Sequence, residues 1–329
     1  MNRRAASLLA GLLLSGCASQ ETMIAADLAP GILPAPNTSV EIPGLGPCTD
    51  SPDRRVRFDA SQPIHVLVHG CYGSSGQFRA LAQVLAFHGQ QSACFTYDDR
   101  AKLDDSANEL RQALVQLADS TGLPQISVIG HSQGALIARR SLTDALPAPL
   151  PRKATELRLV TVSGPFSGIE AARTCGRSWL YPLTLGLLPF SCYLTTGPKW
   201  TDITFASRFI LEPGGLSSRV ADHLKIDTDE RGSCRREEAG RCLESDDIFS
   251  LDEQRLPSTG HDARMKRVVV NAGHVEIVGD KQVAPLKLIE VLQDQGVLRP
   301  TPPERLSAFN RMLAQTYRAP AIGVPAARD

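Results

Sequence analysis

Apolar residues in the middle of this 329-residue chain gather into short runs separated by amphipathic stretches. Five runs have the length and β-branched content of buried strands, at 65–68, 93–97, 126–129, 157–162 and 267–271. Apolar residues recur at helical spacing within 78–86 and 110–117, and the second pattern stops at Gly122 and Pro124. Strands that alternate with helices predict an α/β fold with a mostly parallel, doubly wound sheet covered on both faces.

The alternation of strand and helix patterns stops after Gly164. We predict a cap insertion at about 165–224, because an excursion of this size between sheet strands commonly covers a site. The stretch contains the apolar segment 180–190. This segment can line an acyl pocket, contact lipid or simply pack on the core, and the sequence does not decide among these.

The strand run at 126–129 leads directly into Gly130-His131-Ser132-Gln133-Gly134, and a helical pattern follows. This order predicts a sharp turn with Ser132 at its apex. Such a turn strains its central residue, and glycine at both flanking positions avoids collisions. The first amides of the following helix favour developing negative charge. Ser132 is therefore a candidate nucleophile, although GxSxG also occurs by chance.

The amino terminus resembles the signal sequence of a bacterial lipoprotein. Two arginines precede the apolar run 5–14, which is too short to span a bilayer, and Leu14-Ser15-Gly16-Cys17 matches the lipobox. The resemblance implies cleavage before Cys17 and lipid attachment to Cys17. Ala18, in place of an aspartate, points to the outer membrane. We expect a lipid-anchored protein of the bacterial cell envelope, facing the periplasm or the exterior; an ordinary signal peptide cleaved nearby is the alternative.

Charge and cysteine content bear on three questions: binding of nucleic acid, disulfide formation and metal binding. The 35 basic and 35 acidic residues balance, which removes the electrostatic argument for nucleic acid. In an oxidising compartment disulfides are expected. The simplest pairs are local, Cys175 with Cys192 and Cys234 with Cys242, and one more pair can form among Cys48, Cys71 and Cys94. No CxxC or HxxxH spacing supports a metal site, so neither a metal nor a cofactor is expected.

A serine nucleophile needs a base and oxyanion donors, and both have candidates. His274 follows the late strand, where a loop can carry its imidazole to the serine. His69-Gly70 follows the first sheet strand and opens a glycine-containing loop. We expect the Cys71 amide of this loop, with Tyr72 as the alternative, to form an oxyanion hole with the Gln133 amide.

These residues together resemble the α/β-hydrolases of the bacterial lipase and esterase kind. The matching stretches are VLVHGCYGSSG at 66–76, VIGHSQGALIARR at 128–140, LVTVSGPFSG at 159–168 and VVVNAGHVEIV at 268–278. Ala135 stands where many such lipases have a second glycine. The resemblance covers about 60–290 and implies a catalytic triad in the chain order serine, acid, histidine.

The acid of this triad is the least defined element. Chain order places it between Ser132 and His274. The stretch 245–250 resembles an Asp-Gly loop of these lipases, which makes Asp246 the first candidate. Asp247 replaces the glycine of that loop and is the second candidate. Asp229, after the strand expected near residue 224, is the third.

We therefore expect a serine hydrolase that cleaves carboxylic esters, with a lipid-like small-molecule substrate, through an acyl-enzyme intermediate. The expected organisation is a signal peptide at 1–16, a lipidated tether at 17–52, a hydrolase domain at 53–299 that contains the cap, and a C-terminal helix and tail at 300–329. Thioesterase, acyltransferase or amidase chemistry on the same fold, and a surface lipoprotein without catalysis, are the alternatives.

Overall fold

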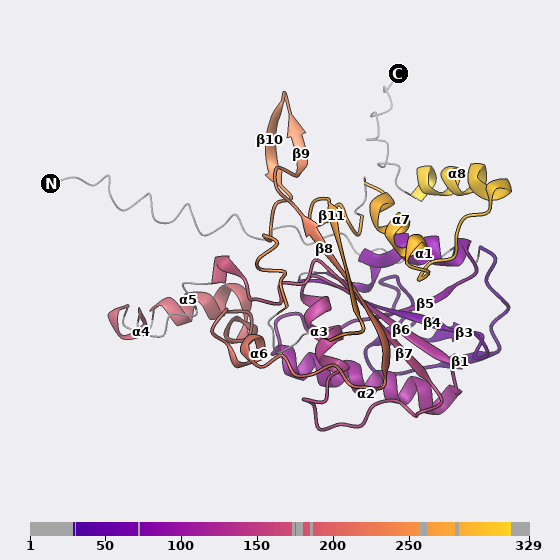
Figure 1. Cartoon of the computed structure of the whole chain (residues 1–329), viewed down its shortest axis with the longest axis horizontal. Helices are drawn as coiled ribbons and strands as arrows, with labels where there is room; N and C mark the ends of the chain where they lie inside the picture. The colour runs from indigo at the N-terminus through magenta and orange to yellow at the C-terminus, as the bar shows by residue number, and fades with distance from the viewer. Residues whose placement is uncertain are drawn as a thin grey trace, which may run out of the picture.

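The computed structural model describes residue 29 and residues 31–71, 73–172, 175, 180–184, 187–256, 262–279 and 283–316. A seven-stranded sheet forms its centre (Figure 1). The strand order is β11 (Met265–Asn271), β8 (Val220–Asp229), β7 (Glu156–Val162), β6 (Gln125–His131), β4 (Ile64–Val68), β5 (Gln91–Phe95) and β2 (Leu45–Gly46). Every neighbouring pair is parallel except β2 with β5. The predicted mostly parallel sheet is confirmed.

Helices cover both faces of this sheet (Figure 1). On one face lie α2 (Leu103–Thr121) and α3 (Gln133–Ser141); on the other lie α1 (Arg79–Phe87), α7 (Leu286–Asp294) and α8 (Leu306–Thr316). Helix α2 ends where predicted, at Gly122, whose φ of 72° is the left-handed conformation that glycine adopts at low cost. The short 3-10 helices η1 (Ser75–Phe78) and η5 (Pro303–Arg305) lead into α1 and α8.

The alternation of side chains along each central strand divides the core in two. Val66 and Val128 belong to the apolar cluster under α2 and α3, whereas Leu67 and Ile129 belong to the cluster under α1 and α7. Adjacent residues of a strand point to opposite faces, so a strand buried on both sides must be apolar throughout. This is why the central strands appear in the sequence as uninterrupted apolar runs.

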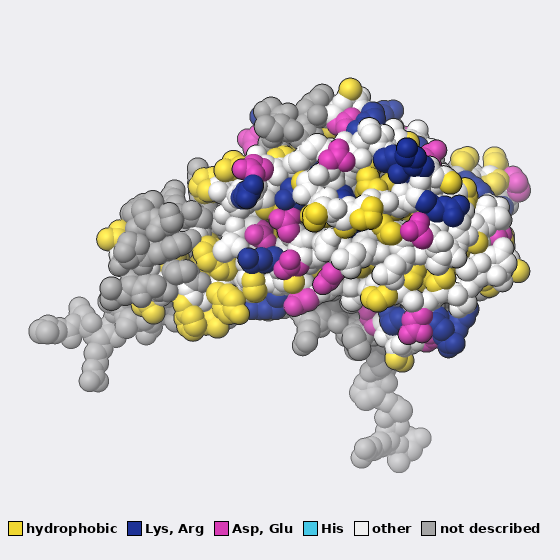
Figure 2. Space-filling view, turned by 90° about the horizontal axis from the view of Figure 1, so that it is seen from below, with side chains coloured by type: hydrophobic (Ala, Val, Ile, Leu, Met, Phe, Trp, Pro, Cys, Tyr) yellow, Lys and Arg dark blue, Asp and Glu magenta, His cyan; other side chains and the backbone are white. Residues whose placement is uncertain are grey.

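The excursion between β7 and β8 consists of short helices at one end of the molecule (Figure 1). They are η2 (Glu170–Ala172), α4 (Leu180–Leu183), α5 (Leu187–Thr196), η3 (Pro198–Thr201) and α6 (Arg208–Leu211). We call this segment, 163–219, the cap segment. Strand β8 begins at Val220, so the segment ends earlier than the predicted boundary at 224. Apolar side chains gather at this end of the surface, while the charged side chains of both signs are interspersed over the rest of the visible face (Figure 2).

Two small antiparallel sheets were not expected from the sequence. Strand β1 (Thr38–Val40) pairs with β3 (Val56–Phe58). Strands β9 (Cys234–Glu238) and β10 (Arg241–Ser245) form a hairpin that projects from the body of the molecule just after β8 (Figure 1). The hairpin separates the end of β8 from the loop that begins at Asp246.

Three disulfides join the cysteines of the described residues, as Cys48–Cys94, Cys175–Cys192 and Cys234–Cys242. The two local pairs expected from the sequence are confirmed. The open question among the remaining three cysteines is resolved by position: Cys48 and Cys94 lie on paired segments, and within the described part of the chain Cys71 is the cysteine outside a disulfide.

Candidate active site

Ser132 occupies the single position between strand β6 and helix α3. Its φ of 55° and ψ of −125° are strained for a residue with a side chain. The flanking glycines make the turn possible: a Cβ at Gly130 would overlap the carbonyl oxygen of Gly134, and one at Gly134 would overlap the carbonyl oxygens of Val68 and His69. The sharp strand-to-helix turn predicted from the sequence is present, with the serine at its apex.

The imidazole of His274 lies against this serine. Its Nε2 is 3.0 Å from the Ser132 Oγ. His274 stands in the loop after β11, and this strand lies at the end of the sheet order, so the loop must return across β8 and β7 to reach the elbow. The side chain of Phe249 packs edge-on against the imidazole, with ring centroids 4.7 Å apart. Both Ser132 and His274 are buried, at 7% and 6% exposure.

The other imidazole nitrogen of His274 contacts a residue that was not predicted from the sequence. Nδ1 lies 2.9 Å from Oε1 of Glu230, which directly follows β8 and is 1% exposed. The Glu230 carboxylate also accepts hydrogen bonds from the Thr228 hydroxyl at 2.7 Å and from the amides of Ile248 and Phe249, both at 2.7 Å. Four donors therefore converge on its two oxygens, an environment suited to a carboxylate.

The expectation that Asp246 orients the imidazole is wrong. The Asp246 carboxylate accepts from the backbone amides of Val275, at 3.0 and 3.1 Å, and Glu276, at 3.0 Å, and its carbonyl accepts the His274 amide at 2.9 Å. Burial raises the pKa of this carboxyl group, partly offset by these amide donors. Asp246 thus holds the backbone of the histidine loop and leaves the imidazole to Glu230.

The structure brings neither of the two alternates, Asp247 and Asp229, to the imidazole of His274. Asp247 is exposed. The Asp229 carboxylate turns outward and pairs with the exposed guanidinium of Arg231, which lowers the pKa of Asp229. Glu230, which contacts the imidazole, is the next residue after the predicted Asp229. Successive side chains at a strand end point to opposite sides, so only Glu230 faces His274.

Comparison with known proteins agrees with this geometry. A sequence model of the family described as "Putative serine esterase (DUF676)" matches residues 60–183, which include the His69 loop and the Ser132 elbow. The propeptide form of the Bacillus licheniformis lipase BlEst2 superposes with a TM-score of 0.52 and 16% identity, over 80% of this chain and 54% of that chain. The chain has the α/β-hydrolase fold.

Two further solved structures have lower scores. The mature form of the same Bacillus licheniformis lipase gives a TM-score of 0.47 and 15% identity over 79% of this chain and 98% of that chain. Esterase B of Lactobacillus rhamnosis gives a TM-score of 0.45 and 13% identity over 86% of this chain and 90% of that chain. None of the curated proteins matches the chain. The family match supports an esterase- or lipase-like hydrolase.

The His69-Gly70-Cys71 loop passes directly beside Ser132. A Cβ at Gly70 would lie 2.9 Å from the Cβ of Ser132, so glycine is required for this approach. The Tyr97 hydroxyl donates to the His69 carbonyl at 2.8 Å, and the two side-chain rings stack with centroids 4.5 Å apart. Across the nucleophile, Gln133 is the first residue of α3. The two residues predicted to supply oxyanion amides therefore flank Ser132, whereas Tyr72 lies outside the described residues.

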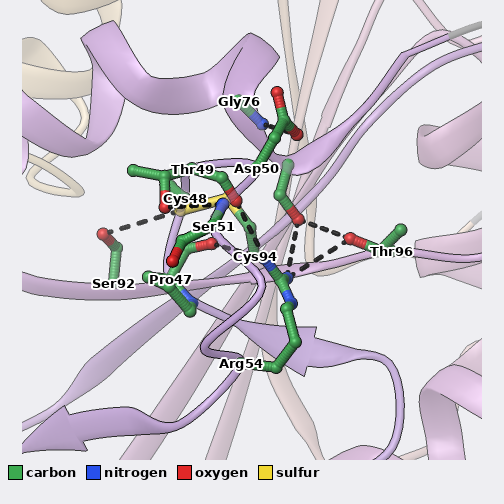
Figure 3. Close-up of a disulfide and its surroundings, with 11 residues drawn as sticks. Pro47, Cys48, Thr49, Asp50, Ser51, Arg54, Gly76, Ser92, Cys94 and Thr96 are labelled. Carbon is green, nitrogen blue, oxygen red and sulfur yellow. Dashed lines mark hydrogen bonds between the residues drawn. A yellow bond between two sulfur atoms is a disulfide. The ribbon is translucent and has the colours of Figure 1, made fainter. Parts of the chain in front are cut away.

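The far end of the same loop is fixed to the segment that carries Cys48 (Figure 3). Asp50 accepts the Gly76 amide at 3.0 Å, and Arg54 donates to the Ser75 hydroxyl at 2.9 Å. The Cys48–Cys94 disulfide ties this segment to β5. The His69-Gly70-Cys71 loop is thus held at both ends.

His131 precedes Ser132 and is buried. Its Nε2 lies 2.9 Å from the carbonyl oxygen of His274, so this nitrogen carries the proton and donates. Burial, with His274 nearby, lowers the pKa of His131 well below its usual value and keeps the ring neutral. The residue before the serine therefore supports the backbone of the residue that contacts the serine.

Cys17 and the predicted signal sequence lie outside the described residues. Within the part of the chain that the structure describes, no helix combines the length and the apolar character needed to cross a bilayer.

Proposed function

We propose that this protein is a serine esterase that hydrolyses carboxylic esters through an acyl-enzyme intermediate, with Ser132, His274 and Glu230 as its catalytic triad. The observation that carries the proposal is the continuous chain of contacts from Ser132 Oγ to His274 Nε2 at 3.0 Å and from His274 Nδ1 to Glu230 Oε1 at 2.9 Å. These distances are those expected of a nucleophile, a base and an orienting acid.

The proposed reaction uses the two nitrogens of His274 in turn. With Nδ1–H donating to Glu230, Nε2 is free to accept the Ser132 hydroxyl proton as Oγ bonds to the ester carbonyl carbon. Collapse of the tetrahedral intermediate breaks the bond to the alkoxy oxygen, which takes the proton from Nε2 and leaves as the alcohol. Water then repeats the sequence, which releases the carboxylic acid and restores the Ser132 hydroxyl.

The negative charge of the tetrahedral intermediate requires fixed donors. We assign this role to the backbone amides of Cys71 and Gln133, because the Gly70 loop is in contact with Ser132 and Gln133 begins α3. Each such amide typically contributes about 10²–10³ in rate.

The surface of the cap segment supports a lipid-like substrate. The described side chains Leu183, Leu187, Phe190 and Leu194 are 70%, 69%, 59% and 58% exposed. The segment 180–196 contains no charged residue. Monomeric soluble proteins seldom expose apolar side chains in such a group.

A fluorophosphonate probe tests the nucleophile. The probe should label the wild-type chain at Ser132, located by mass spectrometry, and should not label Ser132→Ala. Hydrolysis of p-nitrophenyl esters from acetate to palmitate then gives the acyl preference, and parallel thioester and amide substrates separate the neighbouring chemistries. Labelling that persists in Ser132→Ala would overturn the assignment.

We also propose that the chain is anchored to the cell envelope through lipid on Cys17, which the Leu14-Ser15-Gly16-Cys17 match supports. Full-length protein expressed with an alkyne-bearing fatty acid should become labelled and partition into detergent phase. Cys17→Ser should lose both properties, and labelling that survives this change would refute the anchor.

A further inference from the structure

Lys199, in the cap segment, is a lysine with almost no contact with solvent. It lies in η3 and is 1% exposed. Burying an ammonium group costs several kcal/mol unless polar partners replace water. Among the described residues, three acceptors lie within hydrogen-bond distance of its Nζ: the side-chain oxygen of Gln133 at 2.9 Å, the carbonyl oxygen of Asp99 at 2.5 Å and the sulfur of Cys71 at 3.1 Å.

Two of these three partners are the residues whose amides flank the nucleophile. Cys71 comes from the loop after β4, and Gln133 comes from the first turn of α3. The ammonium group bridges their side chains, so it ties together the two sides of the proposed oxyanion hole. The third partner, Asp99, is also linked to Gln133. The side-chain Nε2 of Gln133 donates to the Asp99 carbonyl at 3.0 Å, so the three contacts form a closed ring.

The cap segment is attached to the body of the molecule at the same place. The Lys199 amide donates to the Arg100 carbonyl at 3.4 Å, and the Arg100 guanidinium donates to the carbonyls of Tyr193 and Leu194 in α5 at 3.3 and 3.2 Å. The contacts of Lys199 therefore connect α5, through the Asp99-Arg100 segment, to the residues beside Ser132.

We propose that Lys199 is a positioning residue that sets the relative placement of the Cys71 and Gln133 amides and so couples the cap segment to the oxyanion hole. The proposal rests on the proposed esterase function. Lys199 acts through its neighbours: its ammonium group fixes the side chains of Cys71 and Gln133, and with them the two amides that we assign to the oxyanion hole.

The direct test is Lys199→Met, which keeps the length of the side chain and removes its charge and donors. We expect kcat on p-nitrophenyl butyrate to fall by about 10- to 100-fold, somewhat less than the loss of a whole oxyanion donor, with KM changed by less than about threefold. A transition-state contact affects kcat and kcat/KM alike.

Lys225→Met is the matched control. Lys225 is also 1% exposed, but its Nζ pairs with Asp227 and lies 5.5 Å from the ring centroid of Phe166. This variant should lose thermal stability and keep the kcat of the wild type. If the two lysine variants lose kcat equally, burial alone explains the effect and the proposal is wrong.

A second variant tests the same bridge even if Lys199→Met does not fold. Gln133→Met removes the acceptor for Lys199 and keeps the Gln133 backbone amide. Because both changes open the same bridge, the double variant should lose little more kcat than either single variant. Fully multiplicative losses would show that the residues act separately and would overturn the proposal.

The reactivity of Cys71 gives a readout independent of turnover. An ammonium group near the sulfur favours the thiolate, which is the nucleophilic form. Alkylation of Cys71 by iodoacetamide should therefore be slower in Lys199→Met than in the wild type at pH 7.5, and equal rates would contradict the contact. If the wild type itself shows no turnover that depends on Ser132, the esterase proposal fails. An unchanged kcat in Lys199→Met within an active enzyme refutes the role of Lys199 alone.

Discussion

Glu230 Oε1 lies 2.9 Å from Nδ1 of His274, although 44 positions and a projecting hairpin separate the two residues in the chain. Strands β8 and β11 are parallel neighbours, so their carboxyl ends meet at one edge of the sheet. The residue that follows β8 and the loop that follows β11 can therefore approach Ser132 together. The carbonyl of Asp246 accepts the backbone amide of the same histidine.

The assignment of the acid predicts different effects at these two carboxylates. Glu230→Gln should lower kcat by about 10³–10⁴-fold, because the imidazolium formed during catalysis loses its anionic partner. Asp246→Asn should lower kcat by less than about 10-fold, since an amide oxygen still accepts from the Val275 and Glu276 amides. Initial rates on a p-nitrophenyl ester, with circular dichroism to verify folding, measure both. A larger loss of kcat in Asp246→Asn than in Glu230→Gln would identify Asp246 as the acid instead.

The serine elbow leaves no space for a side chain at Gly134. Gly134→Ala should prevent folding or yield insoluble protein, because the new Cβ would overlap the backbone oxygens of Val68 and His69, which cannot move away. Gly215→Ala is the control, since nothing lies within 4 Å of a Cβ there. The yield of soluble protein and its melting temperature distinguish them; a soluble, stable Gly134→Ala protein would mean that the elbow is less tightly packed.

The disulfides should contribute unequally to stability. Cys48–Cys94 closes 46 residues and Cys234–Cys242 closes 8, for which loop entropy predicts about 4 and about 2.5 kcal/mol. Replacing the first pair by alanine should also slow hydrolysis, because the segment that holds Ser75 and Gly76 is released (Figure 3). Denaturant unfolding and kcat measure the two effects, and equal losses for both pairs would contradict the expectation.

Buried histidines should make the fold sensitive to mild acid. Burial lowers the pKa of His65 to about 4 and of His223 to about 3, below the ordinary value of 6.5. Both rings are almost fully neutral in either state above about pH 7.5, so they add almost no pH dependence there. Below it the unfolded chain binds protons that the folded chain does not, and stability falls by about 1.4 kcal/mol per histidine at pH 5.5.

Denaturant unfolding between pH 7.5 and 5.5 tests this sign. The free energy of unfolding should decrease toward pH 5.5, and His223→Gln should remove about 1.4 kcal/mol of that decrease, whatever its effect at pH 7.5. A pH dependence unchanged by His223→Gln would show that His223 does not titrate as described.

The sequence by itself determined the elements whose signal is local. Apolar runs buried on both sides defined the central strands, and Gly130 and Gly134 around Ser132 defined the elbow, because backbone sterics within a few residues dictate them. The position of His274 followed from its place after a strand. The same local information offered Asp246, Asp247 and Asp229 as the acid and did not name Glu230.

Only the tertiary structure decided which carboxylate meets the imidazole. The choice between Asp229 and Glu230 depends on which way one side chain points at a strand end, and the hairpin of β9 and β10 moves Asp246 to the backbone side of His274. The bridge from Lys199 to Cys71 and Gln133 likewise joins segments 128 and 66 positions apart. Such contacts arise from packing between distant segments, and no periodicity or motif in the chain encodes them.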